Sequence, residues 1–297
     1  MAPVCSGIDR GPSACVWRVG GGESGVPGRM RHDPGSLGPF ELVRELEPHA
    51  VAGRWLALDR RDQSSHLVYR LGPFHDGGDR RRFLSAAAAW ASVQHLHVQR
   101  LEHYGLDGLE RGWLVAPYSG NQHGLVTLAD LLEAKGGRLG AHEAERCVRH
   151  LLEAFEAGHA QRVWHGAIVA QDVLVDPRGC VSIELFGFRR GIEGLGDGNA
   201  ELVVDELRSV ASLAYTMLTG LPAEEPWIPA SRLVKRLDRR WDEWLQQGLE
   251  PTGGFRSATE AIAGLPSERR ESGAPVVATR AGVRSVLSRL GRTISPS

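Results

Sequence analysis

The hydrophobic pattern of the chain changes near residue 118. Before that point, apolar and polar residues alternate in short segments that turn signals separate, and this pattern predicts strands over 40–46, 54–60, 66–71, 100–106 and 112–118. An Ala-rich segment at 79–94, between the third and fourth of them, favours a helix. The first part of the chain is therefore expected to form a small, mostly antiparallel sheet with one helix.

After residue 118 the apolar residues recur with a helical period. Residues 141–160 place five apolar side chains on one helical face: Cys147, Val148, Leu151, Leu152 and Phe155. Further segments with a helical pattern are 128–134, 205–220, 232–249 and 257–265, and a hairpin-like segment at 173–187 interrupts them. The expected fold class is α+β, with a small β lobe followed by a large, mostly helical lobe.

Composition narrows the expected partners. The chain has 297 residues, 42% of them hydrophobic, and a formal net charge of -1, so no global charge steers it toward nucleic acid or a membrane. Its apolar runs are shorter than a bilayer span and its start lacks the apolar core of a signal peptide, which favours a cytoplasmic protein. Residues 1–36 are rich in Gly, Pro, Ser and Arg and are predicted to be a disordered leader, with Met30 as an alternative start.

The last segment, 266–297, is predicted to be a flexible basic tail, because no acidic residue follows Ala274. A short amphipathic helix within it would carry the apolar side chains Val283, Val286, Leu287 and Leu290. Two interpretations remain: a segment that docks on a partner groove or an anionic surface, and a solvated, weakly helical tail.

The sequence offers no evident metal or nucleophile motif. The four cysteines form no CxxC pair, and reduced, buried thiols are expected. Histidines such as His95, His97, His103 and His165 show no pair on one face with a third ligand, so no metal site is expected.

Over residues 38–265 the chain resembles bacterial protein kinases of the eukaryotic-like serine/threonine type. The resemblance rests on the order of several segments: LGPFELVREL at 37–46, GWLVAPY at 112–118, and the stretches 127–166, 209–220 and 241–265. It implies a protein-kinase-like two-lobed fold, with a small lobe at 38–118 and a large lobe at 119–265.

The resemblance also implies where catalysis should occur. The family pattern is His-Arg-Asp followed by an Asn, in which the aspartate accepts the substrate proton and the Asn binds metal. This chain keeps His165 but has Gly166, Ala167 and Asp172 at the other three positions. A methyl group cannot accept a proton.

Family positions that hold metal and phosphate are also changed. Leu185-Phe186-Gly187 stands for Asp-Phe-Gly, and leucine has no oxygen to offer a hard cation. We interpret Glu184 as an ordinary strand residue, with a shifted metal ligand as the alternative. The Gly-rich phosphate loop appears as EPHAVAG at 47–53, in which Gly53 alone cannot rebuild the loop.

The family's lysine–glutamate pair is replaced at both ends, by Arg70 and Ala86. We hypothesise that Arg70 pairs with Asp172 instead. The segment after Gly187 shows no recognisable activation loop. The resemblance also implies that either Asp205 or Glu206 is the acid that bonds back to the catalytic loop.

These substitutions predict a pseudokinase: no enzyme, no cofactor and no metal, acting on a protein partner such as an active kinase, as a scaffold or allosteric regulator. The alternative is a divergent serine/threonine kinase or a nucleotide-binding protein, which would bind Mg–ATP through Arg70, Ala116, Tyr118 and Asp172. Near the end of the large lobe, Trp227, Trp241 and Trp244 are either contact residues or part of the core.

Overall fold

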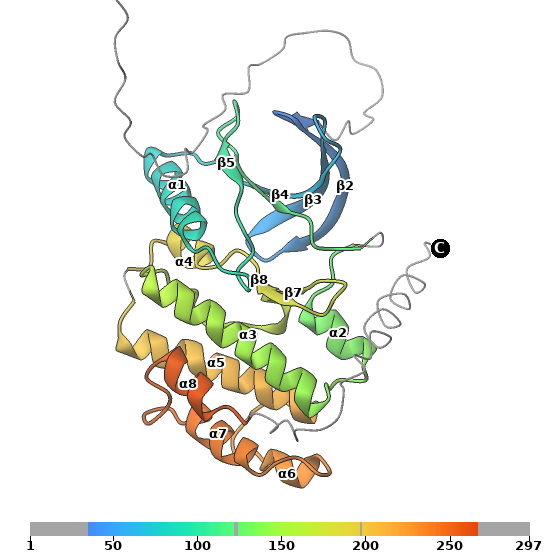
Figure 1. Cartoon of the computed structure of the whole chain (residues 1–297). Helices are drawn as coiled ribbons and strands as arrows, with labels where there is room; N and C mark the ends of the chain where they lie inside the picture. Colours follow the sequence, from blue (N-terminus) through green and yellow to red (C-terminus); the bar gives the residue numbers. More distant parts are fainter. Residues whose placement is uncertain (1–34, 122–123, 197, 267–297) are drawn as a thin grey trace, which may run out of the picture. The chain divides into compact units, whose positions relative to one another are not determined.

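The computed structural model describes residues 35–121, 124–196 and 198–266, and its chain divides into two compact units (Figure 1). Of the described residues, the small unit contains those from 35 to 80 together with Leu101–Ala116. The large unit contains Arg81–Arg100 and the described residues from 117 to 266. Helix α1 (Gly77–Ser92) begins in the small unit and continues into the large one.

The small unit is a curled sheet of six strands (Figure 1), in the order β1-β2-β3-β4-β6-β5. Its neighbouring strands β1 to β4 pair antiparallel in succession, and β5 pairs antiparallel with β6. The strands are β1 (Ser36–Leu37), β2 (Phe40–His49), β3 (Ala52–Asp59), β4 (Ser65–Leu71), β5 (His103–Leu106) and β6 (Gly112–Pro117).

One face of this sheet forms a core, because alternate side chains of a strand point to the same side. The buried members of the cluster are Leu37, Phe40, Leu42, Ala57, Val68, Trp113 and Val115, with Trp55 packed against them. Only the first part of β2 is buried, so the end of the strand near His49 lies outside the core.

The large unit consists mainly of helices. They are α2 (Leu128–Ala134), α3 (Ala141–Ala160), α4 (Phe188–Glu193), α5 (Ala200–Thr219), α6 (Ala230–Leu233), α7 (Arg240–Leu249) and α8 (Ala258–Gly264). A hairpin of β7 (Val173–Val175) and β8 (Val181–Ile183) follows the single turn η1 (Ala170–Asp172). Helix α3 packs against α5 and α8, and Figure 1 shows α3 and α5 side by side.

The predicted apolar face of α3 is confirmed, since all five of its named side chains are at most 5% exposed. The structure has elements that the sequence pattern did not predict, among them the two-residue strand β1 and the short helix α4. The helical segment predicted at 232–249 is two separate helices, α6 and α7. Helix α5 begins at Ala200, before the predicted start at 205, because the Asn199 side chain caps it by accepting from the Leu202 N–H at 2.9 Å.

Some sequence expectations concern residues outside this description. The leader at 1–34 and the tail from 267 lie outside the described residues, and so do Cys5 and Cys15. The predicted boundaries at 36, 118 and 265 stay predictions. None of the helices within residues 35–266 is long and apolar enough to cross a bilayer.

Candidate functional site

The loop that follows α3 is packed by aromatic rings. His165 lies 5.3 Å from the Phe186 ring and 6.0 Å from the Phe155 ring, measured between centroids. Both phenylalanines are fully buried. His165 therefore acts as a packing residue that joins the loop to α3 and to the segment after β8.

A buried acid on α5 holds the same loop. Glu206 is fully buried, and its Oε1 accepts the Gly166 N–H at 2.7 Å while its Oε2 lies 2.7 Å from His159 Nε2. A second link joins the Ile168 N–H to Ser209 Oγ at 2.9 Å. The neighbouring Asp205 is exposed and pairs with Arg208, so Glu206 is the acid that bonds back to the loop.

The two family positions within this loop differ in environment. Ala167 is exposed and presents a methyl group to solvent. Asp172 is part of the turn η1, where its Oδ2 accepts the Val169 N–H at 3.1 Å and its carbonyl accepts the Glu184 N–H at 2.8 Å. The Asp172 carboxylate thus stabilises the turn that leads into β7.

The triplet Leu185-Phe186-Gly187 forms a turn with two left-handed residues. Leu185 has a left-handed backbone, with φ at 49°, and is 3% exposed. Gly187 is also left-handed, and a Cβ there would lie 2.6 Å from Val163 Cγ1, so only glycine fits. The triplet therefore turns the chain into α4 but offers no oxygen ligand at its first position.

Glu184 is not the ordinary strand residue that the sequence analysis assumed, because β8 ends at Ile183 and Glu184 is 1% exposed. Burying a carboxylate such as that of Glu184 costs free energy unless hydrogen-bond or ion-pair partners surround it. The backbone N–H of Glu184 donates to the Asp172 carbonyl. Two acidic residues therefore lie on neighbouring backbone segments of the large unit.

Helices α1 and α4 pack closely at the position of the missing glutamate. Ala86 on α1 is 3% exposed, and a Cβ on Gly191 of α4 would lie 2.5 Å from the Ala86 Cβ. The rings of Phe83 and Phe188 make an edge contact at 5.9 Å beside them. The small side chains at 86 and 191 thus let α4 lie directly on α1.

In the small unit, the segment aligned with the phosphate loop is a tight hairpin. Strands β2 and β3 are joined through Ala50 and Val51, with His49 paired to Ala52. Gly53 belongs to β3 and pairs with Arg70. This confirms that Gly53 is a strand residue and contributes no flexible glycine loop.

Arg70 on β4 has an acid partner within its own unit, since its Nη2 lies 3.9 Å from Asp107 Oδ2. Asp107 also faces Arg111, with 3.3 Å between the carboxylate and Nε. The hypothesised pairing of Arg70 with Asp172 stays a prediction. Of the remaining ATP candidates, Ala116 is fully buried in β6, and the Tyr118 hydroxyl donates to the Asn121 carbonyl at 3.0 Å.

Within each of the two units, the residues at these positions fit a Mg–ATP complex poorly. The β2–β3 hairpin lacks a glycine-rich turn, and Leu185 supplies no oxygen for magnesium. We derive no reaction step through Mg–ATP.

The tryptophans of the large unit are mostly structural. Trp241 and Trp244 are each 3% exposed, and Trp244 Nε1 donates to the Ala261 carbonyl at 2.9 Å. Trp227 is half-buried, with its ring 6.0 Å from the Tyr215 ring. Of the two interpretations, core packing applies to Trp241 and Trp244.

One cluster was missed by the sequence analysis. His97, His150 and Cys180 place potential metal-ligand atoms within 4.8 Å of one another. His97 and Cys180 belong to the histidines and cysteines for which the sequence predicts no metal site, because the three residues are far apart in sequence and follow no ligand spacing. The apolar periodicity of the segments that contain them does not predict that these three side chains meet.

Comparisons with known proteins bear on the fold. No protein-family model matches the sequence, and no curated protein sequence matches it either. Many solved structures match its fold. One is the kinase domain of PknI from Mycobacterium tuberculosis, which is 17% identical, has a TM-score of 0.62, and is matched over 80% of this chain and 98% of that domain.

This likeness contradicts the prediction that the chain is not an enzyme. The matching structure is a kinase domain, so substitutions at family positions do not by themselves exclude catalysis, and that prediction is corrected. The predicted fold, in contrast, is confirmed: a curled antiparallel sheet followed by a helical part is the protein-kinase fold.

Proposed function

We propose that this kinase-like domain acts through protein–protein contacts, as a scaffold or an allosteric regulator of a signalling partner such as an active kinase. The observation that carries the proposal is a contrast within one loop. Glu206 holds the loop with two contacts at 2.7 Å, whereas Ala167 offers an exposed methyl group where the family has its base. The loop is thus held in one conformation and presents a fixed surface to solvent.

Exposed apolar side chains near this loop support the same proposal. Val169, two residues after Ala167, is 51% exposed, and Leu195, after α4, is 50% exposed. Apolar side chains at such positions favour contact with another protein, where burying one contributes about 1.5–3 kcal/mol. The near-neutral net charge of -1 favours a protein partner over nucleic acid, and we propose the cytoplasm as its location.

The contact function is tested by Val169→Asp. The intact chain, tagged and expressed in its own bacterium, should capture a reproducible partner, and Val169→Asp should lower the captured amount at least about tenfold, as expected when a buried contact of that size is lost. Val43→Asp is the matched control, because Val43 is similarly exposed at 48% but lies on β2. Equal capture by all three chains would contradict this role for the loop.

A second candidate is a divergent phosphotransferase. The observation that favours it is the adjacency of Asp172 and the buried Glu184, together with the likeness to a kinase domain. Two neighbouring carboxylates can bind a divalent cation. This candidate uses acids other than the family's aspartates.

Titration with Mg–ATP separates the candidates. Binding of ATP would raise the melting temperature, and transfer would move a labelled γ-phosphoryl group. In an active chain, Asp172→Asn should lower the transfer rate at least about 100-fold, and the exposed Asp205→Asn should leave it unchanged. The second candidate fails if millimolar Mg–ATP produces neither a melting shift nor transfer.

A further inference from the structure

We propose that the large unit contains a transition-metal site with three protein ligands, in which His97, His150 and Cys180 bind one divalent ion of the zinc type. The site goes beyond the proposed function, since it lies outside the loop at 165–172. It would fasten three separate segments to one another: the connection after α1, helix α3, and the turn between β7 and β8.

The spacing of the donor atoms suits such an ion. The three ligand atoms lie within 4.8 Å of one another, and Cys180 Sγ lies 3.7 Å from His97 Nδ1. A tetrahedral zinc ion with bonds of about 2.1 Å to nitrogen and about 2.3 Å to sulfur separates such ligands by about 3.6 Å. The Cys180–His97 pair is therefore already at the separation that the ion requires.

Backbone hydrogen bonds hold two of the segments in place. The Ile183 N–H donates to the His97 carbonyl, and the Gln99 N–H donates to the Ile183 carbonyl, each at 2.9 Å. These bonds fasten the connection after α1 to β8. Because both segments are fixed before any ion arrives, less conformational entropy is lost on binding.

The chemistry of the donors also favours a borderline-soft ion. Two imidazoles and one thiolate form a ligand set typical of zinc and unsuited to magnesium or calcium. His150 Nδ1 is buried and makes no hydrogen bond.

Binding must remove a proton from the thiol. A free cysteine is mainly a thiol at neutral pH, because its ordinary pKa is about 8.5. The ion would form a bond to Sγ as the S–H bond breaks, and one proton would leave to solvent. Two neutral imidazoles and one thiolate leave the site with a net charge of +1.

A second layer of partners is present around His97. Its Nε2 lies 3.5 Å from Glu153 Oε2. Its Nδ1 lies 2.8 Å from the Val181 carbonyl oxygen, so binding of the ion at Nδ1 would break that contact. When Nδ1 binds the ion, its proton moves to Nε2, which then faces the Glu153 carboxylate. A carboxylate behind a ligating histidine orients the ring and raises its basicity, which makes Glu153 a positioning residue.

One side chain must turn to complete the site. The rings of His97 and His150 are stacked, with centroids 3.8 Å apart and an angle of 11° between their planes. Nitrogen lone pairs lie in the ring plane, so two parallel rings cannot direct them at one point. His150 is half-buried, and its ring would rotate about its side-chain bonds to direct a nitrogen at the ion. Water would then fill the fourth position.

The test uses the full-length chain, freed of metal with a chelator, and two probes: zinc(II) for calorimetry and cobalt(II) for spectroscopy. We expect one ion per chain and a thiolate-to-cobalt absorption band. Cys180→Ser should abolish that band, and both Cys180→Ser and His150→Gln should weaken zinc binding at least about 100-fold. Glu153→Gln should weaken it about 10- to 100-fold.

The matched control is His142→Gln, which changes an exposed histidine on the same helix and should leave zinc affinity unaltered. The proposal is overturned if the intact chain binds no zinc, or if cobalt binds without the thiolate band. It is also overturned if Cys180→Ser and His150→Gln bind zinc as tightly as the intact chain. Because the first two readouts need no variant, a variant that fails to fold does not weaken the test.

Discussion

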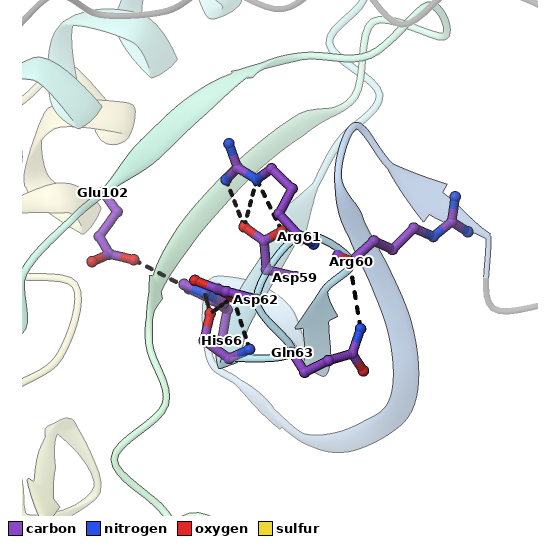
Figure 2. A network of polar contacts seen from close by, with 8 residues as sticks. Asp59, Arg60, Arg61, Asp62, Gln63, His66 and Glu102 are labelled. Atoms are coloured by element: carbon purple, nitrogen blue, oxygen red, sulfur yellow. Dashed lines mark hydrogen bonds and ion pairs between the residues drawn. The ribbon is translucent and has the colours of Figure 1, made fainter.

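Asp59 is an acid whose charge the small unit stabilises strongly. Its carboxylate is 4% exposed and accepts the Arg61 backbone N–H at 2.9 Å and Arg61 Nε at 3.0 Å (Figure 2). Beside it, His66 lies between Ser64 Oγ, at 2.8 Å, and Glu102 Oε2, at 3.1 Å. The hydrogen bonds from Arg61 lower the pKa of Asp59 from 3.8 to about 2.

This pKa predicts how stability depends on pH. Because the folded pKa lies below the unfolded one, the unfolded chain binds more protons between these values, and the stabilisation is present above pH 3.8 and lost as pH falls toward about 2. Asp59→Asn should therefore be less stable than the intact chain near pH 5, and the difference should shrink below pH 4.

The measurement is the free energy of unfolding in urea at a series of pH values from 5 to 2. Glu41→Gln serves as the control, since Glu41 is exposed, with 58% of its side chain accessible, and pairs with Arg60 at 3.4 Å. It should change stability little at any pH. A difference between Asp59→Asn and the intact chain that stays constant with pH would contradict the prediction.

Glu206 gives a second prediction for a single residue. Glu206→Ala removes a fully buried acceptor and leaves the Gly166 N–H and the His159 ring without it. We expect a loss of about 3 kcal/mol in the free energy of unfolding.

The neighbouring acid provides the comparison. Asp205→Ala breaks only an exposed ion pair with Arg208 and should cost less than about 1 kcal/mol. Denaturant unfolding of both variants distinguishes them. Equal losses would mean that the contacts of Glu206 do not stabilise the loop.

At the scale of elements, the contact between α1 and α4 depends on two small residues. Ala86→Glu would restore the residue type that kinases have there, but it would place a carboxylate against Gly191 in a site that is 3% exposed. We expect a loss of about 3 kcal/mol or more, since a larger, charged side chain must be buried or displace α4.

Ala88→Glu is the matched control, because Ala88 lies on the same helix and is exposed. Helix propensity changes little between these residues, so its stability should stay within about 0.5 kcal/mol of the intact chain. Thermal unfolding checks both variants. If Ala86→Glu is as stable as Ala88→Glu, the two helices do not depend on this close packing.

Elements differed in how well the sequence predicted them. Helix α3 was predicted at its observed bounds because twenty residues repeat one apolar face without interruption. Helix α4 has six residues, a glycine among them, and one buried side chain, Phe188. Its helix forms because Phe188 packs on Phe83 and Trp90 of α1, which is a tertiary contact.

At the scale of the whole molecule, net charge predicts solution behaviour. A formal charge of -1 and an isoelectric point near 6.9 leave little repulsion between copies at neutral pH. Solubility of the intact chain should be lowest near pH 7 and rise at pH 8.5, where the chain is more acidic. Precipitation with ammonium sulfate across this range measures it. A solubility that does not change over that range would contradict the prediction.

The sequence by itself determined the order of the main strands and the long helices, because periods of two and 3.6 residues are written locally along the chain. Its resemblance to protein kinases also led to the prediction that positions such as Ala167 and Leu185 are changed. From those identities it led to a wrong conclusion on enzymatic activity, since the kinase fold itself is shared with a solved kinase domain.

Only the tertiary structure decided which distant residues meet. It chose Glu206 over Asp205 as the acid that binds the loop, since a shift of one residue around α5 changes burial from complete to exposed. It also brought His97, His150 and Cys180 within 4.8 Å of one another. Local periodicity describes which face of an element is apolar, whereas the meeting of side chains from three elements depends on how those elements pack.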